Sequence, residues 1–551
     1  MGNKRTGGRI LVDQLRIQGV DRIFSVPGES YLAVLDALCD VPEIENIICR
    51  QEGGVTYMAC ADGALTGRPG IAFVTRGPGA TNASIGVHVA MQDSIPMILF
   101  IGDIDRGMRD REGFQEVDFP AMFAPLAKWA TRIEDAARIP EYLARAFHVA
   151  TSGRPGPVVI ALPEDMLLDE VEARDRPVSL PHLIVPDVTE SPQHDILERI
   201  KAAKHPIAII GGADWDESAN LHFAAFAERW GLPVATAFRR QDCFPPNSPV
   251  YAGNLGYGPN PKLVARIKES DLILAVGARL GEATTDGYTI ITPDHPGQML
   301  IHVHPDADEL NRVYHADIPV CCPVTVFAEM LAALKPLERP FPDGADAHAE
   351  WLEWNTPQPF DTPLDLGQCV AAMRTICPAD SIICNGAGNF SGWWHRYWRY
   401  DGFGTQLAPT NGSMGFGVPA AVAACLRRPD RCVVALAGDG DFLMNGQELA
   451  TAAQYGCNLL VILVDNGSYG TIRMHQEREF PARVSGTSLV NPDFAMLARA
   501  YGGWAEAVET TQDFAPALER AMAQTGIKLL HLKTDVERIS AGTTISALRG
   551  R

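Results

Sequence analysis

Short apolar runs bounded by glycine or proline recur along the whole chain. A continuous apolar run of roughly four to eight residues is typical of a strand buried on both faces of a parallel sheet. Amphipathic stretches with room for crossover helices separate most neighbouring runs. The pattern therefore predicts an α/β chain with doubly wound, mostly parallel sheets. The runs lie at residues 23–26, 71–75, 97–102, 158–163, 207–212, 272–277, 381–384, 433–438, 459–464 and 529–533.

Two segments interrupt this alternation and divide the chain. Residues 173–194 and 335–363 are rich in proline and charged residues and show little periodicity. A chain of 551 residues also exceeds the roughly 100–200 residues that are usual for one domain. We therefore expect three domains, at residues 1–172, 190–337 and 360–551.

The amino-acid composition indicates which binding partners and which cellular compartment to expect for this protein. Lysine and arginine number 47 and aspartate and glutamate 67, which gives a formal net charge of −20. Such a surface repels nucleic-acid phosphates and anionic lipids, so we expect neither kind of partner. The twelve cysteines form no CxxC pair, which favours reduced thiols. The sequence has neither a signal-like start nor an apolar run of membrane-spanning length, and we expect a soluble, cytoplasmic protein.

The strongest local signal is a pair of turns that follow two successive apolar runs. Gly438–Asp441 reads Gly-Asp-Gly-Asp and Asp465–Ser468 reads Asp-Asn-Gly-Ser, with 28 positions from Gly438 to Asn466. The carboxyl ends of parallel strands meet at one edge of a sheet, where open α/β sheets bind ligands. The spacing therefore predicts that both turns contribute to one site.

These turns carry the groups that a magnesium diphosphate needs. Mg²⁺ takes one or two protein carboxylates and completes its octahedron with phosphate and water oxygens. Asp439, the side-chain oxygen of Asn466 and a backbone carbonyl near Ser468 are the predicted metal ligands. Asp-Gly and Asn-Gly are also favoured in ordinary turns, so either turn alone would be uninformative. An EF-hand is excluded, because neither aspartate of the first turn has a glutamate at the twelfth loop position.

Gly-Asp-Gly followed at this spacing by Asn resembles the signature of thiamine-diphosphate-dependent enzymes. Nearly the whole chain is similar to the acetolactate synthase-like members of that family. The resemblance implies thiamine diphosphate and Mg²⁺ as cofactors, with the pyrimidine bound by the first domain and the diphosphate by the third. Those two surfaces meet across subunits in this family, so a homodimer or homotetramer is implied. The matching cofactor-binding positions are Glu52, Gly388, Asn389, Phe390, Gly412, Met414, Gly438, Asp439, Gly440, Asp441, Asn466, Ser468, Tyr469 and Gly470.

Two of these positions match residues with specific roles in the family. Glu52 matches the glutamate that hydrogen-bonds N1′ of the aminopyrimidine and so activates the cofactor. Met414 matches the apolar wedge under the bent cofactor, and the Gly412 carbonyl and Met414 amide would bond the pyrimidine. Without the resemblance, Glu52 would be interpreted as a surface carboxylate at a strand end and Met414 as core packing.

The residues expected near the reacting carbons favour carboligation. Phe114 and Gln115 resemble the Phe-Gln-Glu segment of acetolactate synthases, whereas simple decarboxylases of the superfamily carry paired histidines near there. Without such proton donors, the carbanion or enamine left by decarboxylation of a 2-oxo acid is expected to attack an acceptor carbonyl. Pyruvate is the first candidate substrate. The Phe-Gln pair could alternatively be one core residue and one surface residue of a helix.

Three further residues bear on the substrate. Glu29 departs from the acetolactate synthase pattern and stands where some decarboxylases have an acidic residue. It is a candidate for contacting substrate and shuttling a proton, with an N-cap or loop role as the alternative. Lys128 matches a family lysine near the substrate carboxylate, and a surface lysine is the alternative. His475 stands where acetolactate synthases place an acceptor-selecting tryptophan, so acceptor preference is not carried over.

The middle domain leaves its ligand open. The segment after Ile209 is not G-x-G-x-x-G, so hydride transfer with a nicotinamide is not supported. Gly277–Leu280 resembles a flavin-contacting strand of acetolactate synthases, but the stretch Tyr251–Gly258 matches the family only partly. FAD is therefore possible but not predicted, and these fragments do not exclude the adenine nucleotide that oxalyl- and hydroxyacyl-CoA lyases bind in this domain.

Three functions of different kinds follow from these residues. The leading hypothesis is a thiamine-diphosphate- and Mg²⁺-dependent decarboxylase and carboligase. A carbon–carbon lyase or non-ligating decarboxylase, acting on a larger 2-oxo acid or a 2-hydroxyacyl-CoA, would use the same cofactor. An inactive structural or assembly relative is the remaining alternative. Such chains usually lose the activating glutamate or a metal ligand, whereas Glu52, Asp439 and Asn466 are all present.

Overall fold

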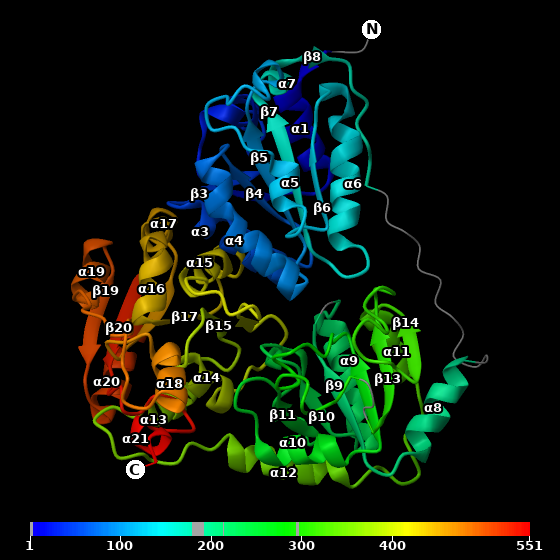
Figure 1. The fold of residues 1–551 in the computed structure, drawn as a ribbon, viewed down its shortest axis with the longest axis vertical. Helices are drawn as coiled ribbons and strands as arrows, with labels where there is room; N and C mark the ends of the chain where they lie inside the picture. Colours follow the sequence, from blue (N-terminus) through cyan, green and yellow to red (C-terminus); the bar gives the residue numbers. More distant parts are fainter. Residues whose placement is uncertain (1–3, 179–191, 213, 294–296, 551) are drawn as a thin grey trace. The chain divides into compact units, whose positions relative to one another are not determined.

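The computed structural model describes residues 4–178, 192–212, 214–293 and 297–550, with most of its elements labelled in Figure 1. Three six-stranded sheets carry the fold, and all their neighbouring strands are parallel. Contacts group the chain into two compact units. The first unit comprises Met1–Leu183, Val422–Arg427 and Asn445–Tyr455, and the second comprises Ile184–Ala421, Arg428–Met444 and Gly456–Arg551.

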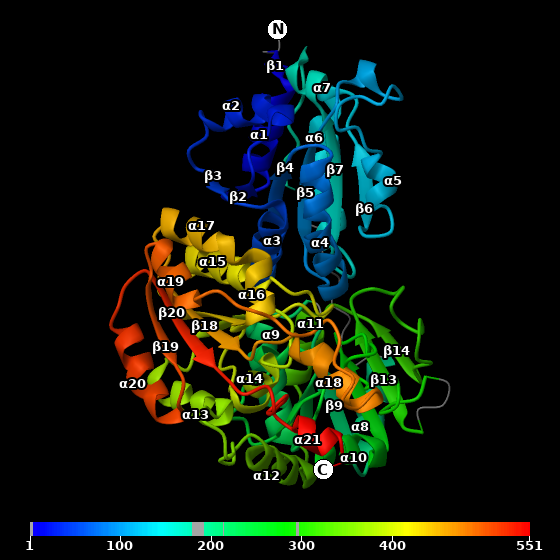
Figure 2. The ribbon, with the colours of Figure 1, turned by 60° about the vertical axis from the view of Figure 1, so that its left-hand side comes forward.

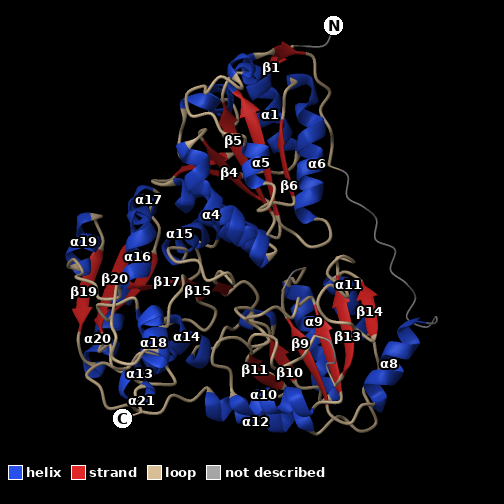
Figure 3. Ribbon diagram, in the orientation of Figure 1, coloured by secondary structure: helices blue, strands red, loops and turns tan. Residues whose placement is uncertain are grey.

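The first unit is built on a sheet with strand order β3-β2-β4-β5-β7-β6. Helices α1 and α6 pack on one face of this sheet and α3 and α4 on the other, as Figure 3 shows. The strands are β2 (Arg22–Ser25), β3 (Glu45–Ile48), β4 (Gly70–Val74), β5 (Met97–Asp103), β6 (Trp129–Arg132) and β7 (Pro157–Pro163), beside a small antiparallel pair of β1 (Arg5–Thr6) and β8 (Glu170–Val171). The helices are α1 (Gly7–Ile17), α2 (Leu32–Leu38), α3 (Glu52–Thr66), α4 (Pro78–Asp93), α5 (Phe119–Phe123), α6 (Ile139–Thr151) and α7 (Glu164–Leu168).

The local sequence explains where α3 begins and ends. The Gln51 side chain accepts a hydrogen bond of 3.1 Å from the Gly54 amide and so caps the first turn. Gly67 ends the helix with φ of 65°, a left-handed conformation that glycine adopts without steric cost. The helix places Glu52 in its first turn, where the partial positive charge of the helix N-terminus stabilises a carboxylate.

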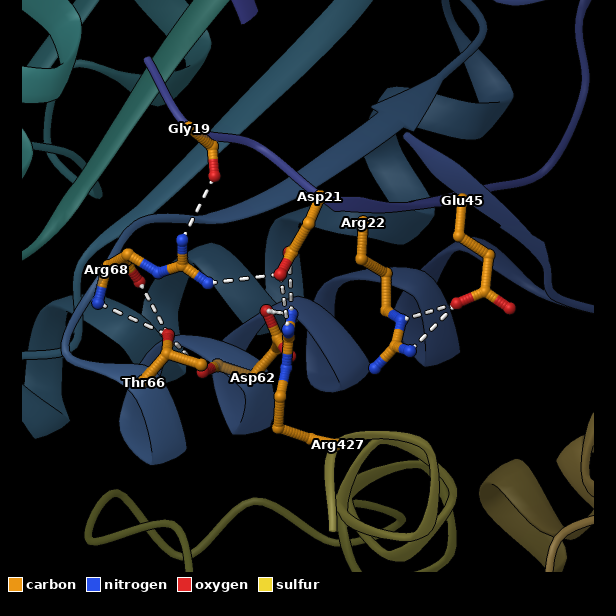
Figure 4. A network of polar contacts seen from close by, with 8 residues as sticks. All are labelled: Gly19, Asp21, Arg22, Glu45, Asp62, Thr66, Arg68 and Arg427. Atoms are coloured by element: carbon orange, nitrogen blue, oxygen red, sulfur yellow. Dashed lines mark hydrogen bonds and ion pairs between the residues drawn. The ribbon is translucent and has the colours of Figure 1, made fainter. Parts of the chain in front are cut away.

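The other end of α3 is fixed by an arginine from α15 (Gly417–Arg427), as Figure 4 shows. Arg427 donates from Nε and Nη2 to the two carboxylate oxygens of Asp62, at 2.7 and 2.9 Å. It also donates to both oxygens of Asp21, at 2.9 and 3.1 Å, and Arg68 donates to Asp21 at 3.3 Å. Asp62 lies on α3, so this bidentate pair anchors the helix that begins with Glu52.

The second unit contains the central sheet, with strand order β11-β10-β9-β12-β13-β14. The chain starts at β9 in the middle and winds outward first on one side and then on the other, which is the doubly wound arrangement. The strands are β9 (Pro206–Ile210), β10 (Val234–Thr236), β11 (Tyr251–Asn254), β12 (Leu272–Val276), β13 (Met299–His304) and β14 (Ile318–Cys321). The helices are α8 (Pro192–Ala202), α9 (Glu217–Trp230), α10 (Pro261–Glu269), α11 (Val324–Ala332) and α12 (Asp343–Trp354).

The second unit also contains the sheet of the C-terminal domain, with strand order β16-β15-β17-β18-β20-β19. Helices α13 and α20 pack together on one face of it (Figure 2). The strands are β15 (Ile382–Asn385), β16 (Gln406–Leu407), β17 (Val433–Gly438), β18 (Leu459–Asp465), β19 (Trp504–Val508) and β20 (Ile527–Lys533). The helices are α13 (Leu366–Ile376), α14 (Ser391–Tyr397), α16 (Asp439–Asn445), α17 (Leu449–Gln454), α18 (Gly470–Glu479), α19 (Phe494–Ala500), α20 (Thr511–Met522) and α21 (Ile545–Leu548), with α17 belonging to the first unit.

The predicted fold class is confirmed, because three α/β domains each contain a six-stranded parallel sheet. Each of the ten apolar runs overlaps a strand of these sheets. The exact domain ends stay a prediction. Within the part of the chain that the structure describes, no helix is both long and apolar enough to cross a bilayer.

Candidate active site

The sequence-predicted residues of the first domain other than Lys128 gather at one edge of its sheet. Four adjacent strands, β3, β2, β4 and β5, each end in a loop at this carboxyl edge. Glu52 follows β3, Glu29 follows β2 and Gln115 follows β5. The turn Thr75–Gly79 follows β4. Such an edge is where open α/β sheets bind ligands.

Glu52 points toward the start of α4. Its Oε2 accepts a hydrogen bond of 2.9 Å from Nδ2 of Asn82. A Cβ built on Gly79 would lie 3.5 Å from Glu52 Oε1, so the glycine-containing turn after β4 packs against the carboxylate. One carboxylate oxygen is therefore held by the protein while the group stays only partly buried.

The turn before Glu52 is fixed by two residues that the sequence analysis missed. Glu448 is fully buried, and its Oε1 accepts hydrogen bonds of 3.0 Å from the amides of Arg50 and Gln51. Its Oε2 accepts from the Thr451 hydroxyl at 2.6 Å, and burial raises the pKa of the Glu448 carboxyl. The Tyr455 hydroxyl accepts from the Ile48 amide at 2.8 Å. These contacts join segments about 400 residues apart in the chain, a pairing that no local sequence pattern signals.

Gln115 packs directly on the turn after β4. Gly77 has φ of 47° and ψ of −102°, and a Cβ there would lie 2.8 Å from the Gln115 Cβ. Only glycine accommodates both this backbone conformation and this approach. Gln115 is thereby brought beside the turn that also contacts Glu52, whereas the Phe114 side chain is 72% exposed.

The loop that carries Phe114 and Gln115 is conformationally unusual. Asp110, Glu112 and Gln115 have φ values of 62°, 54° and 65°, in the left-handed region that non-glycine residues seldom adopt. Strain of this kind persists where the surrounding structure enforces it, often at binding sites. The Glu116 carboxylate supports the loop by accepting from the Asp110 and Gly113 amides, each at 2.8 Å. The loop lines an open surface depression of about 540 Å³, formed by Asp110, Glu112, Gly113, Gln115 and Glu116.

Glu29 lies at this edge but in an ion pair. Its Oε1 accepts from Nη2 of Arg76 at 2.9 Å, and Nη1 of Arg76 donates to Glu164 at 2.9 Å. A proton shuttle would need a carboxyl group whose pKa is raised by burial. The Glu29 side chain is 65% exposed within this subunit, so the subunit alone does not bury it in that way. The loop that carries Glu29 follows β2 and is next to the one that carries Glu52, whereas β4 separates it from the strand that precedes Gln115.

Lys128 is not brought together with these residues. It precedes β6, at the amino edge of the sheet, which is opposite the edge that carries Glu52. Its Nζ donates to the Ser152 carbonyl at 2.6 Å. The role predicted for Lys128 next to the substrate carboxylate therefore has no support from this arrangement.

The predicted cofactor-binding residues of the third domain also gather at a carboxyl edge. Strands β16, β15, β17 and β18 are adjacent, and predicted residues lie at or after the carboxyl end of each. In that order they are Gly412 and Met414, Gly388 to Phe390, Gly438 to Asp441 at the end of β17 and the start of α16, and Asn466 to Gly470. The sheet thus brings together four segments that the sequence analysis treated as one site.

Asp439 and Asn466 converge on a single amide. The Ser468 N–H lies 3.2 Å from Asp439 Oδ2 and 3.1 Å from Asn466 Oδ1. Burial raises the pKa of Asp439 to about 6, and a bound cation would offset that cost by stabilising the anion. No cluster of three Asp, Glu, His or Cys side chains that could hold a metal occurs among the described residues. A cation here would therefore combine Asp439 with amide, backbone and cofactor oxygens, which are ligands typical of Mg²⁺.

Asp441 ties the loops to one another. Its Oδ1 accepts from the Gly415 amide at 2.8 Å and from the Ala387 amide at 3.2 Å. The residue is 2% exposed, and burial raises the pKa of its carboxyl to about 7. Asp441 thus positions the loop with Gly412 and Met414 against the loop that follows β15.

Three predicted contacts have a structural role in the domain itself. Asn389 is engaged by Thr471, whose hydroxyl lies 3.0 Å from its Oδ1, and by the Ile539 carbonyl, 3.0 Å from its Nδ2. Phe390 is 8% exposed and belongs to the core beside β17. The Tyr469 ring packs over Gly440, where a Cβ would lie 2.5 Å from it. Gly388 has φ of 153°, and a Cβ there would lie 2.8 Å from the Phe390 ring, so this position favours glycine.

Family models match each of the three domains in order. Residues 5–122 match the thiamine pyrophosphate enzyme N-terminal TPP binding domain, residues 194–334 its central domain, and residues 386–532 its C-terminal TPP binding domain. The acetolactate synthase large subunit of Parasynechococcus marenigrum is 32% identical over 518 residues, which cover 90% of this chain and 82% of that protein. The chain belongs to the thiamine pyrophosphate enzyme family.

Other members of this family are similar over most of the chain. The acetolactate synthase large subunit of Lactococcus lactis subsp. lactis is 31% identical, over 90% of this chain and 87% of that protein. The acetolactate synthase isozyme 2 large subunit of Escherichia coli is 30% identical, over 96% and 95%. The two TPP binding domains of the family correspond to the two sheet edges that carry the candidate residues.

Proposed function

We propose that the protein is a thiamine-diphosphate- and Mg²⁺-dependent enzyme that decarboxylates a 2-oxo acid. The carbanion or enamine that remains is then transferred to an acceptor carbonyl. Pyruvate is the first candidate for the 2-oxo acid, because the similar proteins are named acetolactate synthases. The convergence of Asp439 and Asn466 on the Ser468 amide is the observation that carries the proposal.

The C-terminal edge supports the binding half of this function. When bound, thiamine diphosphate supplies the nucleophilic carbon and the electron sink for decarboxylation. Asp439 and Asn466 would hold Mg²⁺, together with a backbone carbonyl near Ser468. Asp441 holds the flanking loops in register, and the loop with Gly412 and Met414 would receive the pyrimidine.

The first-domain edge supports the activating and selecting half. Glu52 is held on one side by Asn82, which leaves its second oxygen able to exchange a proton with N1′ of an aminopyrimidine. The strained loop with Gln115 would line the substrate side. No histidine occurs between residues 104 and 118, so this loop offers no imidazole proton donor to quench the fragment before it meets an acceptor.

The proposed assembly rests on the family resemblance, and the proposed location on the composition of the sequence. We propose a homodimer or homotetramer, because the pyrimidine- and diphosphate-binding surfaces of different subunits form one site in this family. We further propose a cytoplasmic location and a small-molecule acceptor. FAD in the central domain is not part of the proposal.

Glu29 favours a second candidate function, a decarboxylase that releases its product after protonation. It places an exposed acid on the loop after β2, within the same sheet edge as Glu52. Arg76 holds that acid in place. Product analysis separates the two functions.

The test is incubation of the full-length protein with Mg²⁺, thiamine diphosphate and pyruvate, with carbon dioxide and acetolactate followed together. We expect acetolactate in proportion to carbon dioxide, and loss of both in Glu52→Gln. Carbon dioxide accompanied by free acetaldehyde would support the decarboxylase instead. No turnover of pyruvate by protein that has bound thiamine diphosphate would contradict the proposed substrate, and larger 2-oxo acids and acyl-CoA compounds would then be tried.

A further inference from the structure

Next to the proposed metal ligands lies a partly buried set of hydrogen-bonded polar side chains that the family motif does not contain. Asn491, in the loop before α19, uses one amide group to contact two carboxylates. Its Nδ2 lies 2.8 Å from Asp439 Oδ2 and 2.7 Å from Asp465 Oδ1. A side-chain amide has two N–H donors, so Asn491 can satisfy both carboxylates at once.

Asp465 is saturated by donors from the protein. Its Oδ1 accepts from the Gly467 amide at 2.9 Å in addition to Asn491, and its Oδ2 lies 2.8 Å from Nε2 of His531. Both carboxylate oxygens are therefore engaged within the domain. Asp465 follows the same strand as Asn466, but these bonds direct it to a supporting position rather than to a cation.

His531 is the last residue of this hydrogen-bonded set, next to Asp465. It lies on β20, is 4% exposed, and its ring meets the Phe494 ring edge-on with 5.2 Å between centroids. Phe494 is the first residue of α19, three positions after Asn491. The histidine therefore contacts Asp465 directly and also packs against the helix that follows the asparagine.

These contacts give Asp439 an orientation that the Gly-Asp-Gly motif alone would not fix. Its Oδ1 accepts from the Gly440 amide at 2.9 Å, and its Oδ2 accepts from Ser468 and Asn491. If Asn491 were removed, two neighbouring carboxylates would lose their shared donor, and like charges in a buried site repel. Residues that orient a metal ligand in this way typically change metal affinity by about 10–100-fold when they are mutated.

We propose that Asn491, Asp465 and His531 are positioning residues that orient Asp439 for the cation and thereby set the Mg²⁺ affinity of the diphosphate site. This inference rests on the proposed function, because it assumes that Asp439 binds Mg²⁺ with thiamine diphosphate. It assigns to three residues outside the metal ligands a role that can be measured without turnover.

The experiment measures the Mg²⁺ concentration that gives half-maximal thiamine diphosphate binding to the full-length protein, by quenching of tryptophan fluorescence. The unfolding temperature of the cofactor-free protein is measured in parallel. The variants are Asn491→Ala, His531→Ala and His531→Gln, since glutamine can place an N–H donor near the position of Nε2. Asn458→Ala is the control, because Asn458 precedes the same strand at its opposite end, where it accepts from Lys528.

We expect Asn491→Ala to raise the half-saturating Mg²⁺ concentration by about 10–100-fold, while Asn458→Ala leaves it unchanged. His531→Ala should raise it by a smaller factor, and His531→Gln should restore most of the loss. If Asn491→Ala does not fold, the His531 pair decides, since only a positioning role predicts recovery by glutamine.

Two results would overturn the inference, and they are distinguishable. Wild-type protein that binds thiamine diphosphate with Mg²⁺, alongside Asn491→Ala and His531→Ala with unchanged half-saturation, would refute the positioning role alone. Wild-type protein that binds no thiamine diphosphate at any Mg²⁺ concentration would refute the proposed function, and the inference with it.

Discussion

Replacement of Arg427 by alanine should destabilise the helix that carries Glu52. The substitution removes both bidentate pairs shown in Figure 4, one with Asp62 and one with Asp21. The two carboxylates differ in environment, since the side chain of Asp62 is 7% exposed and that of Asp21 is 50% exposed. The loss of the Asp62 pair should therefore dominate.

The expected cost follows from this difference. Removing one partner of a buried ion pair costs about 3–5 kcal/mol, because the other charge stays buried without compensation. Exposed pairs contribute about 0–1 kcal/mol, so Asp21 adds little. The Arg427 side chain is itself 13% exposed, so water can partly solvate Asp62 after truncation, and the lower end of the range, about 3 kcal/mol, is expected.

Hydrogen exchange is the suitable assay, because a chain with several domains does not unfold in one cooperative step. Amide exchange in peptides covering residues 52–66 reports the opening free energy of α3 in wild type and variant. Arg68→Ala is the matched control, since the Arg68 side chain donates to the exposed Asp21 carboxylate and to the Gly19 carbonyl, whereas Arg427 pairs with Asp62. Adding Asp62→Asn to Arg427→Ala should recover part of the loss. An opening free energy within about 1 kcal/mol of wild type in Arg427→Ala, or an equal loss in Arg68→Ala, would refute this reasoning.

Two further predictions concern the loop beside Glu52 and the central sheet. Gly77→Ala should reduce turnover of the 2-oxo acid about 10–100-fold with cofactor binding retained, because a Cβ there meets Gln115 at 2.8 Å; steady-state kinetics and thiamine diphosphate titration check this. Burial lowers the pKa of His304 from 6.5 to about 4, so the folded state resists the proton that the unfolded state takes up, and stability falls as pH drops through that interval. Relative to His304→Leu, the free energy of unfolding of wild type should fall by about 2 kcal/mol between pH 7 and pH 4.5, measured from urea unfolding of the central domain. The same pH dependence of the free energy of unfolding in both proteins would contradict this.

The sequence predicted the inner strands of each sheet and missed the outer ones. All six edge strands, β3, β6, β11, β14, β16 and β19, lack the continuous apolar run that marks a strand covered on both faces. Of the inner strands only β10, with three residues, and β13 were missed. In β13 the buried side chains of His302 and His304 interrupt the apolar pattern, although both positions lie inside the sheet.

The candidate site divides in the same way between local and distant signals. Asp439 and Asn466 follow strands in short motifs whose spacing predicts that they meet at one sheet edge, whereas Glu52 is predicted from the resemblance of its segment to the family. The residues that hold them in place come from elsewhere in the chain. Glu448 lies almost 400 residues from the turn it fixes, and Asn491 lies 52 residues from Asp439. Hydrogen bonds between such distant positions depend on the folded sheet, so a single sequence does not reveal them.

The most direct test of the account is deuterium exchange at C2 of the bound thiazolium, followed by acid quench and NMR in wild type and Glu52→Gln. Both proteins are loaded with Mg²⁺ and thiamine diphosphate, and binding is verified by titration. We expect Glu52→Gln still to bind the cofactor but to exchange C2 deuterium at least about 100-fold more slowly, because its amide cannot exchange a proton with N1′. Equal exchange rates in the two proteins would contradict the assignment of Glu52 as the activating residue.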